Sequence, residues 1–157
     1  MGLSHVDEKG NARMVDVSQK QHTERTAIAT GRIRMKESTI KMILEGSMPK
    51  GDVIATARIA GIMGAKHTDK LIPMCHNLPL DGIKVSLDVN EQINGIDIKA
   101  VAKCVWKTGV EMEALTAVSI AALTLYDMCK AVDKEMVIED IMIVKKTGGK
   151  SGDYNRV

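Results

Sequence analysis

A long stretch without helix-breaking residues, from Thr108 to Asp133, constrains the fold of this chain most strongly. It is rich in Ala, Leu and Met, and after Gly109 it contains neither Pro nor Gly, which is typical of a stable helix. Thr108 stands three residues before Glu111, the spacing of a capping box in which each side chain bonds the backbone N–H of the other residue. We therefore predict one helix over about residues 110–132, which at ~1.5 Å per residue is about 33 Å long.

This helix is expected to be buried, because apolar residues cover most of its circumference. Most of that surface carries Leu115, Val118, Ala121, Ala122, Leu125 and Cys129. The polar residues fall on one narrow stripe, at Glu113, Thr116, Asp127, Lys130 and Lys134. A helix that is apolar on most sides is buried, and a buried charge needs a partner or a ligand. The residues of this polar stripe are therefore the first candidates for a functional site.

The composition favours one globular domain and a small ligand. The 157 residues are enough for a single domain with its own core, so we expect one catalytic or binding domain over residues 1–157. Aromatic residues make up only 2%, which leaves few stacking platforms for nucleic acid, and a net charge of +2 is too small to indicate DNA binding. We expect no nucleic-acid partner; an RNA-binding domain is the alternative, and it would show affinity for RNA that falls steeply with salt.

The cysteines and the N-terminus indicate a reducing compartment. The three cysteines, Cys75, Cys104 and Cys129, are odd in number and widely spaced, which fits free thiols in a cytoplasm. The first residues are polar and lack the apolar run of a signal peptide. No stretch approaches the roughly 20 apolar residues of a membrane helix. We therefore expect a cytoplasmic protein without a membrane span.

Hydrophobic periodicity predicts an α+β fold. Alternation predicts a short strand at residues 14–17 and longer strands over residues 26–35, 83–90, 96–106 and 136–145. Two further helices are expected over 38–45, ended by Gly46, and 53–66, capped by Asp52. This order matches a ferredoxin-like antiparallel sheet with helices packed on one face. The other face of such a sheet needs water or a partner subunit, so we expect a homo-oligomer.

The two ends of the chain carry weaker signals. Residues 1–12 have the composition of a flexible arm, and residues 146–157 that of a mobile, glycine-rich tail. The tail segment Gly148-Gly-Lys-Ser151 is not a Walker motif, because that motif requires a glycine at position 144, where this chain has Val, and a helix afterwards. A glycine-rich tail can still wrap an anion with its backbone N–H groups, and a solvated tail is the alternative.

The histidines and cysteines do not have the spacing of a metal site. Cys75 and His76 are adjacent, and His22 and His67 do not complete the intervals of a zinc site with them. We therefore predict no metal ligands. His76 lies in a loop between two prolines, where it suits a polar contact, a phosphate contact or proton transfer, with an ordinary loop histidine as the alternative.

Four lysines stand at the expected boundaries of elements: Lys50, Lys66, Lys130 and Lys146. Several converging ammonium groups suit a polyphosphate and stabilise charge in a transition state. Asp127 lies three residues before Lys130 and faces it on the helix, either as part of a site or as an internal salt bridge. A carboxylate, ammonium groups and an imidazole together suit general acid–base chemistry. The residues alone thus indicate a protein that handles a phosphate-bearing small molecule.

Five segments of the chain resemble one enzyme family. They are Met14-Val-Asp-Val, Leu71-Ile-Pro-Met-Cys-His, Thr108-Gly-Val-Glu-Met-Glu-Ala-Leu, Tyr126-Asp-Met-Cys-Lys-Ala and Lys146-Thr-Gly-Gly-Lys-Ser-Gly-Asp. Together they are similar to the cyclic pyranopterin monophosphate synthases, the C proteins of molybdenum cofactor (molybdopterin) biosynthesis. The resemblance runs from about Met14 to Tyr154. It implies a ferredoxin-like subunit assembled as a homohexamer, a trimer of dimers, with active sites at subunit interfaces.

The resemblance also implies a lyase reaction and roles for individual residues. The substrate would be a cyclised dihydro-GTP, rearranged to cyclic pyranopterin monophosphate with release of pyrophosphate. Asp127 and Lys130 would be catalytic, with Lys50 as a second essential ammonium group. The substrate-binding residues would be Met74, Cys75, His76, Met112, Glu113, Lys66, Lys146, Arg25 and Asp16. No cofactor is implied, although Mg²⁺ suits a triphosphate.

Two positions depart from the family pattern. Asn77 follows the Cys-His pair where a proline is usual, and His67 stands where another basic residue is usual. The reacting groups are retained, so we expect activity. The alternative is a catalytically silent nucleotide-binding or regulatory module on the same fold, since a fold alone does not fix a function.

Glu113 and Asp127 stand far apart on the expected helix. About 14 residues separate them, or about 21 Å at the helical rise. One compact substrate does not reach both from a single helix. We therefore expect the two ends of the helix to belong to different active sites, each completed across a dimer interface.

Overall fold

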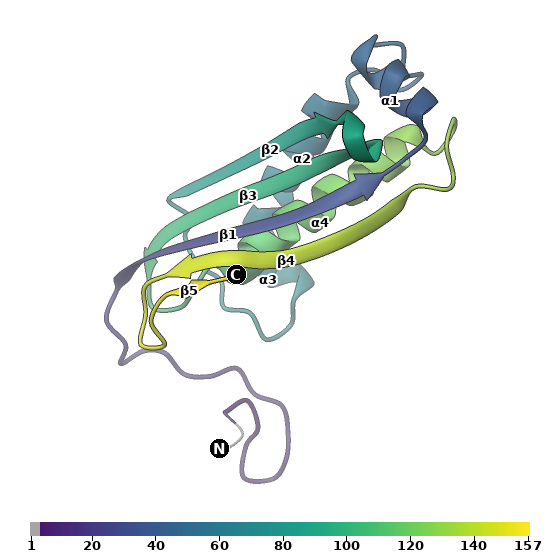
Figure 1. Cartoon of the computed structure of the whole chain (residues 1–157). Coiled ribbons are helices and arrows are strands. Elements are labelled where there is room, and N and C mark those ends of the chain that lie inside the picture. Colours follow the sequence, from purple (N-terminus) through teal and green to yellow (C-terminus); the bar gives the residue numbers. More distant parts are fainter. Residues whose placement is uncertain (1–3) are drawn as a thin grey trace.

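The computed structural model describes residues 4–157, in which helices pack against a sheet (Figure 1). The helices over these residues are α1 (Glu37–Leu44), α2 (Val53–Lys66), α3 (Thr68–Leu71), the 3₁₀ turn η1 (Glu91–Ile93) and α4 (Glu111–Cys129). The strands are β1 (Thr23–Arg34), β2 (Gly82–Asn90), β3 (Gly95–Trp106), β4 (Val137–Thr147) and β5 (Tyr154–Asn155). The predicted α+β class is therefore confirmed.

The strands form one antiparallel sheet in the order β2-β3-β1-β4-β5. Its first four strands have the order of a ferredoxin-like fold, in which β1 and β2 are separated by β3. Helices α2 and α4 lie together on one face of this sheet (Figure 1). The prediction of a sheet covered by helices on one face is confirmed.

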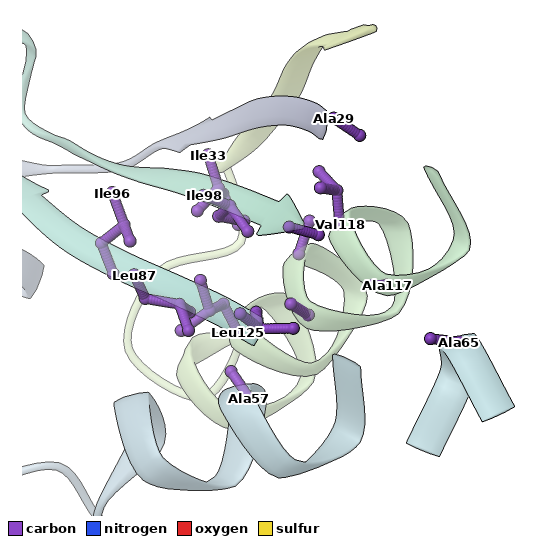
Figure 2. Packing of buried hydrophobic residues seen from close by; sticks show 14 of the residues in the cluster. Ala29, Ile33, Ala57, Ala65, Leu87, Ile96, Ile98, Ala117, Val118 and Leu125 are labelled. Atoms are coloured by element: carbon purple, nitrogen blue, oxygen red, sulfur yellow. The ribbon is translucent and has the colours of Figure 1, made fainter. Parts of the chain in front are cut away.

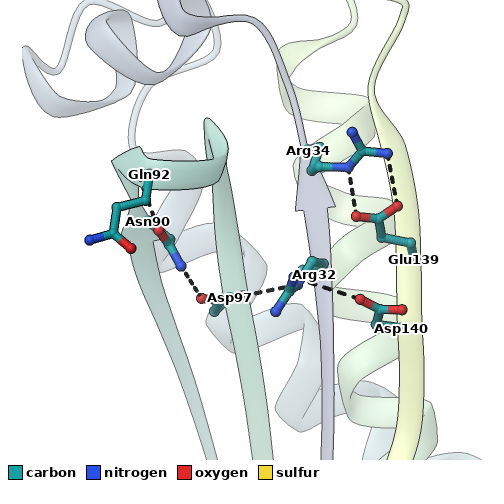
Figure 3. Close-up of polar contacts among 7 residues, drawn as sticks. All are labelled: Arg32, Arg34, Asn90, Gln92, Asp97, Glu139 and Asp140. Carbon is teal, nitrogen blue, oxygen red and sulfur yellow. Dashed lines mark hydrogen bonds and ion pairs between the residues drawn. The ribbon is translucent and has the colours of Figure 1, made fainter.

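The open face of the sheet is crossed by ion pairs (Figure 3). Arg34 donates two hydrogen bonds to the Glu139 carboxylate, at 2.6 and 2.9 Å. Arg32 lies between Asp97 at 3.3 Å and Asp140 at 3.7 Å. Asp140 has a φ of 57° beside an irregularity in the β1–β4 register, and this bulge turns its carboxylate toward Arg32. Such exposed pairs contribute little stability, but they make this end of the open face polar.

The core lies between the sheet and α4, with α2 packed on the far side (Figure 2). Most of the residues that meet there are small or β-branched. They are Ala29, Ile33, Ile96 and Ile98 of the sheet, Ala117, Val118 and Leu125 of α4, and Ala57 and Ala65 of α2. A Cβ atom added at Gly61 of α2 would lie 2.9 Å from the carbonyl oxygen of Ala117. The two helices therefore approach at backbone distance.

Helix α4 is shorter than predicted and begins differently. Its N-cap is Val110, with no side-chain cap, so the predicted capping box of Thr108 and Glu111 is wrong. The Glu111 carboxylate instead lies against Gly109 and pairs with Lys146 at 3.4 Å. Glu111 therefore forms an ion pair with a distant residue and does not form the predicted hydrogen bond with the backbone of Thr108. By length and composition α4 could cross a membrane, but ten of its residues are buried in the core, as in the central helix of a globular domain.

Asp52 and Gly46 lie at the helix boundaries that the sequence predicted for them. The Asp52 carboxylate accepts a hydrogen bond from the Ala55 N–H at 2.9 Å, so the predicted cap of α2 is confirmed. Gly46 ends the region of α1 with a φ of 66°, which residues other than glycine rarely adopt. Asn94 closes the β2–β3 hairpin in the left-handed region at a φ of 48°.

Within the described residues, the two ends of the chain contain little regular secondary structure. Residues 14–17 form no strand, so that prediction is wrong. The arm is closed by a Val6–Ala12 bridge, and its residues 1–3 lie outside the described part of the chain. At the other end β4 reaches Thr147, and the tail then turns back so that β5 pairs with β4. The glycines of the tail have positive φ angles, which allow the chain to reverse its direction.

Close packing of α2 on α4 makes Gly61 intolerant of a side chain. We expect Gly61→Val to lower the free energy of unfolding by about 1–3 kcal/mol, because a backbone oxygen cannot move aside as a side chain can. Urea denaturation measures this change. Gly82→Ala is the control, since a Cβ there meets no atom within 4 Å. Equal stability of Gly61→Val and the wild type would contradict the packing.

Candidate functional site

The C-terminal end of α4 carries a cluster of three charged side chains, which we call the Asp127 cluster: Lys50, Asp127 and Lys130. The Asp127 carboxylate accepts a hydrogen bond from Lys130 Nζ at 2.7 Å and another from Lys50 Nζ at 2.9 Å. Lys50 Nζ also donates to the backbone oxygen of Asp127, at 3.0 Å. The structure thus brings together the three residues for which the resemblance implies catalytic roles.

Two separate segments build this cluster. Asp127 lies in the last turn of α4, and Lys130 is the C-cap residue, so their spacing of three places both side chains on one side of the helix. Lys50 comes from the turn between α1 and α2, where Gly51 at a φ of 85° allows the chain to reverse. Lys50 and Asp127 are far apart in the sequence, and the packing of α2 along α4 brings them into contact.

The Asp127 cluster is exposed in the single chain, which corrects one prediction. The side chains of Lys50, Lys130 and Asp127 are 41%, 52% and 55% exposed, so the polar stripe is not buried at this end. Leu125 and Cys129 turn the apolar side of this turn toward the core, and the opposite side is left to solvent. The stripe is buried only near the start of α4, at Glu113 and Thr116.

The cluster fixes the charge of its members. Hydrogen bonds from Lys130 and then Lys50 lower the pKa of Asp127 to about 2. The hydrogen bond to Asp127 in turn raises the pKa of Lys130. At neutral pH the carboxylate is therefore ionised and the Lys130 ammonium group is protonated, an arrangement that stabilises developing negative charge or releases a proton to it.

The N-terminal end of α4 carries a buried carboxyl group, Glu113, which is 3% exposed. Cys75 Sγ donates a weak hydrogen bond to Glu113 Oε1 at 3.9 Å, and Oε2 is buried without a hydrogen-bond partner in the described part of the chain. Burial raises the pKa of Glu113 to about 7 and that of the Cys75 thiol to about 11. We call these two residues the Glu113 subsite. It has an unused acceptor and a thiol that stays protonated.

The loop before β2 is tied to the N-terminal segment. His76 Nε2 donates to the backbone oxygen of Val15 at 2.6 Å, which fixes the ring beside this segment. The Asp16 carboxylate bonds the Ser18 N–H at 2.8 Å, and that bond lowers the pKa of Asp16. The motif at residues 14–17 is therefore held as an irregular segment against the loop that contains Cys75.

A hollow of about 630 Å³, which we call the basic cleft, opens where the start of α4 meets the end of β4. The charged residues that line it are Lys20, Arg25, Lys107, Glu111, Lys146 and Lys150. Lys146 lies 3.4 Å from Glu111 and donates to Ser151 Oγ at 2.6 Å. The Arg25 guanidinium reaches only the backbone oxygen of Lys107, at 3.5 Å, and its Nε is buried without a partner within residues 4–157.

Sequence reasoning found part of this cleft and missed the rest. Arg25 and Lys146 were predicted from the resemblance, and Lys150 lies in the quoted tail motif but was not singled out. Lys20 and Lys107 lie in no motif. Met74 and Met112 are half-buried in the loop before β2 and at the start of α4. Lys66 is exposed and lines a different hollow, beside Leu78 and Leu80, so the structure does not bring it to Lys146.

The candidate residues thus form two groups at opposite ends of α4. Glu113 and Asp127 lie about 21 Å apart along the axis at ~1.5 Å per residue. The basic cleft is lined by none of the three residues of the Asp127 cluster. Within residues 4–157, no three His, Cys, Asp or Glu side chains gather as metal ligands would.

Comparison with known proteins identifies the family. A model of the MoaC family matches residues 14–149. A cyclic pyranopterin monophosphate synthase from Thermoanaerobacter pseudethanolicus is 58% identical over 156 residues, which cover 99% of each chain. Proteins of the same name from Clostridium acetobutylicum and Clostridium perfringens are 57% and 59% identical, over 99% and 98% of this chain and 96% and 97% of their own. The chain therefore belongs to the MoaC family.

Proposed function

We propose that this chain is a cyclic pyranopterin monophosphate synthase, a lyase of molybdenum cofactor biosynthesis. Its substrate would be 3',8-cyclo-7,8-dihydroguanosine triphosphate, and its second product would be pyrophosphate. One observation carries the proposal: Asp127 is held between the ammonium groups of Lys50 and Lys130, which reach it from different segments. The joint retention of Asp127, Lys130, Lys50 and His76 argues against the alternative, a catalytically silent nucleotide-binding module.

The Asp127 cluster supplies the acid–base part of the proposed reaction. The rearrangement requires proton transfers on the ring system and stabilisation of a departing diphosphate. Lys50 and Lys130 can each donate a proton or neutralise phosphate charge, while the Asp127 carboxylate keeps both ammonium groups in place. No metal or cofactor takes part in this scheme, and a Mg²⁺ ion on the triphosphate would count as part of the substrate.

The Glu113 subsite is proposed to hold the ring system. A pterin or guanine edge presents ring and exocyclic N–H donors, and Glu113 Oε2 is an acceptor without a partner within residues 4–157. The pKa of about 7 lets this carboxyl exist in both forms at neutral pH, because burial stabilises the uncharged form. Met74, Cys75, His76 and Met112 would form the walls around the ring.

The two groups of residues are proposed to meet only across a subunit interface. About 21 Å of helix separates Glu113 from Asp127, and this distance is longer than a single compact substrate. A second copy would bring its Asp127 cluster to the basic cleft and Glu113 subsite of the first, within a hexamer built as a trimer of dimers. The exposure of the Asp127 cluster and the open sheet face leave surfaces for such contacts. Free thiols at Cys75, Cys104 and Cys129 suit a cytoplasmic location.

Removal of one ammonium group tests the proposed chemistry. We expect Lys130→Ala to fold and assemble normally but to release pyrophosphate from the cyclised GTP about 100-fold more slowly, or not at all, because it loses an acid–base group. Circular dichroism and size-exclusion chromatography check the fold and assembly. Lys134→Ala is the control, since Lys134 is exposed and its side chain does not bond Asp127. Undiminished turnover by Lys130→Ala would refute the catalytic role.

The raised pKa of Glu113 predicts a pH dependence of stability. The folded protein retains a proton, up to a pKa of about 7, that the unfolded chain releases near the ordinary value of 4.5. This contribution to stability is therefore present below pH ~4.5 and is lost as the pH rises toward ~7, by up to about 1.4 kcal/mol per pH unit. Urea denaturation of wild type and Glu113→Gln between pH 5 and 8 measures the difference. Parallel pH profiles of the two proteins would contradict the assignment.

A further inference from the structure

The carboxyl group of Asp133 is buried just beyond the end of α4, and the residue is 1% exposed. Its oxygens accept three hydrogen bonds: from the Lys36 N–H at 2.8 Å, the Thr39 hydroxyl at 3.2 Å and the Glu135 N–H at 3.0 Å. Burial acts to raise the pKa of Asp133, but these hydrogen bonds outweigh it and lower the pKa below its ordinary value. Asp133 is therefore a buried, ionised carboxylate whose charge is stabilised by three donors.

Asp133 supplies a cap for the N-terminus of α1. The N-cap residue of α1 is Lys36, and within residues 4–157 its own side chain does not cap the helix. Thr39 is the third residue of the helix, and in a capping box a side chain at this position bonds the N–H of the N-cap residue. The Asp133 carboxylate instead bonds both the Lys36 N–H and the Thr39 hydroxyl, and its charge lies at the positive end of α1. Helix α1 thus begins on a residue that follows the end of α4.

Asp133 is fixed relative to the Asp127 cluster, because it lies only three residues after Lys130. The N–H groups of Lys130 and Asp133 donate to the Tyr126 and Cys129 oxygens, at 2.9 and 3.1 Å. Cys129 is fully buried, so this last turn is tied to the core. The buried Asp133 carboxylate and the exposed Asp127 cluster therefore belong to one hydrogen-bonded segment.

Lys50 reaches the same segment from the other end of α1. The Ser47 N–H donates to the Met42 oxygen at 2.9 Å, so the chain leaves α1 in a fixed direction. The Gly51 N–H donates to the oxygen of Met48 at 3.0 Å, which closes the turn that carries Lys50, and Met48 is buried. The position of the Lys50 side chain relative to the Asp127 cluster therefore depends on where α1 is held.

Helix α1 is embedded in the core far less than α4. It lies at the end of the sheet where β1 finishes, beside the C-terminal end of α4 (Figure 1). Thr39 and Ile40 are the buried residues among its eight, whereas ten residues of α4 are buried. The hydrogen bonds of Asp133 are therefore a large part of what fixes the start of α1.

We propose that Asp133 is a positioning residue of the synthase: by holding α1 on the end of α4, it places the Lys50 ammonium group against Asp127. This inference rests on the proposed function, in which Lys50 takes part in acid–base steps. Because its carboxyl group is buried and bonded by α1, Asp133 acts through Lys50 and not on the substrate. A displacement of about 1 Å in a reacting group lowers a rate by up to about 100-fold, so a cap remote from the chemistry can control turnover.

The reactivity of the Lys50 amine tests this placement without substrate. Lys50 Nζ donates to the Asp127 carboxylate and to its backbone oxygen, and these hydrogen bonds must break before the amine can be acetylated. We expect acetic anhydride to acetylate Lys50 about fivefold faster in Asp133→Ala than in the wild type. Asp133→Asn retains one acceptor oxygen and should give an intermediate rate. Mass spectrometry of the labelled peptides measures the rates.

Two controls separate the placement of Lys50 from a general loss of stability. Lys84, exposed on β2, is the internal reference and should react at the same rate in every variant. Thr68→Val is the matched variant, because it removes a buried hydroxyl that donates to the Ala65 oxygen at 3.0 Å, at the opposite end of α2 from Lys50. It should lower stability but leave the labelling of Lys50 within about twofold of the wild type. Equal acceleration in Thr68→Val and Asp133→Ala, or no acceleration in either Asp133 variant, would overturn the proposal.

Turnover separates this proposal from the proposed function. At equal amounts of folded and assembled protein, Asp133→Ala should lower kcat about tenfold or more and change KM less than about twofold, since it displaces a reacting group without removing a substrate contact. Asp133→Asn should retain more activity, and Thr39→Val, which removes one of the three donors, provides the same comparison if Asp133→Ala does not fold.

The outcomes of the two measurements are distinct. A faster-labelled Lys50 together with an unchanged kcat would overturn the positioning role, while product formation by the wild type would leave the enzyme assignment standing. A wild type that forms no product from the cyclised GTP would refute the proposed function. The labelling rates would then still decide whether Asp133 places Lys50 against Asp127.

Discussion

The close approach of α4 to the sheet and to α2 is the constraint on which the rest of the structure depends. A Cβ atom at Gly31 would lie 2.7 Å from a methyl carbon of Val118, and one at Gly61 would lie 2.9 Å from the Ala117 oxygen. Fully buried alanines extend this contact along the helix, at Ala27, Ala29, Ala100, Ala102, Ala114, Ala121 and Ala122. Packing of this density leaves no room for a ligand between the middle of α4 and the sheet or α2. The charged side chains of the helix, Glu111, Glu113 and Asp127, lie only at its two ends.

The two ends offer different physical environments. At the C-terminal end Asp127 is exposed and bonded by two ammonium groups, so its charge is fixed across the neutral range. At the N-terminal end Glu113 is buried, has one oxygen without a partner within residues 4–157, and titrates near neutral pH. Desolvation governs one carboxyl group and ion pairing the other. A single helix therefore carries one permanently ionised carboxylate and one that gains or loses a proton readily.

The sequence predicted those features that depend on neighbours in the chain. Asp52 as the cap of α2, the alternation in β1 and β3, and the pairing of Asp127 with Lys130 all arise within a few residues. Predictions failed where a distant segment intervened: Glu111 bonds Lys146 of β4 and therefore does not complete a capping box. The basic cleft was only partly predictable for the same reason, because its lysines converge through tertiary structure. Lys50 was placed beside Asp127 by family resemblance, not by any local pattern.

The different charges of the Asp127 cluster and the basic cleft favour an active site that two copies of the chain share. The Asp127 cluster has acid–base groups but little excess positive charge. The basic cleft has excess positive charge, and its ion pair of Lys146 with Glu111 is less exposed than the pairs of the Asp127 cluster. Neither end alone contains both elements of the proposed reaction, and the rigid α4 between them cannot shorten. A flexible chain could close such a gap by bending, but a helix packed at backbone distance on two sides cannot. Association of copies is therefore the arrangement by which this fold would place both sets of groups around one substrate.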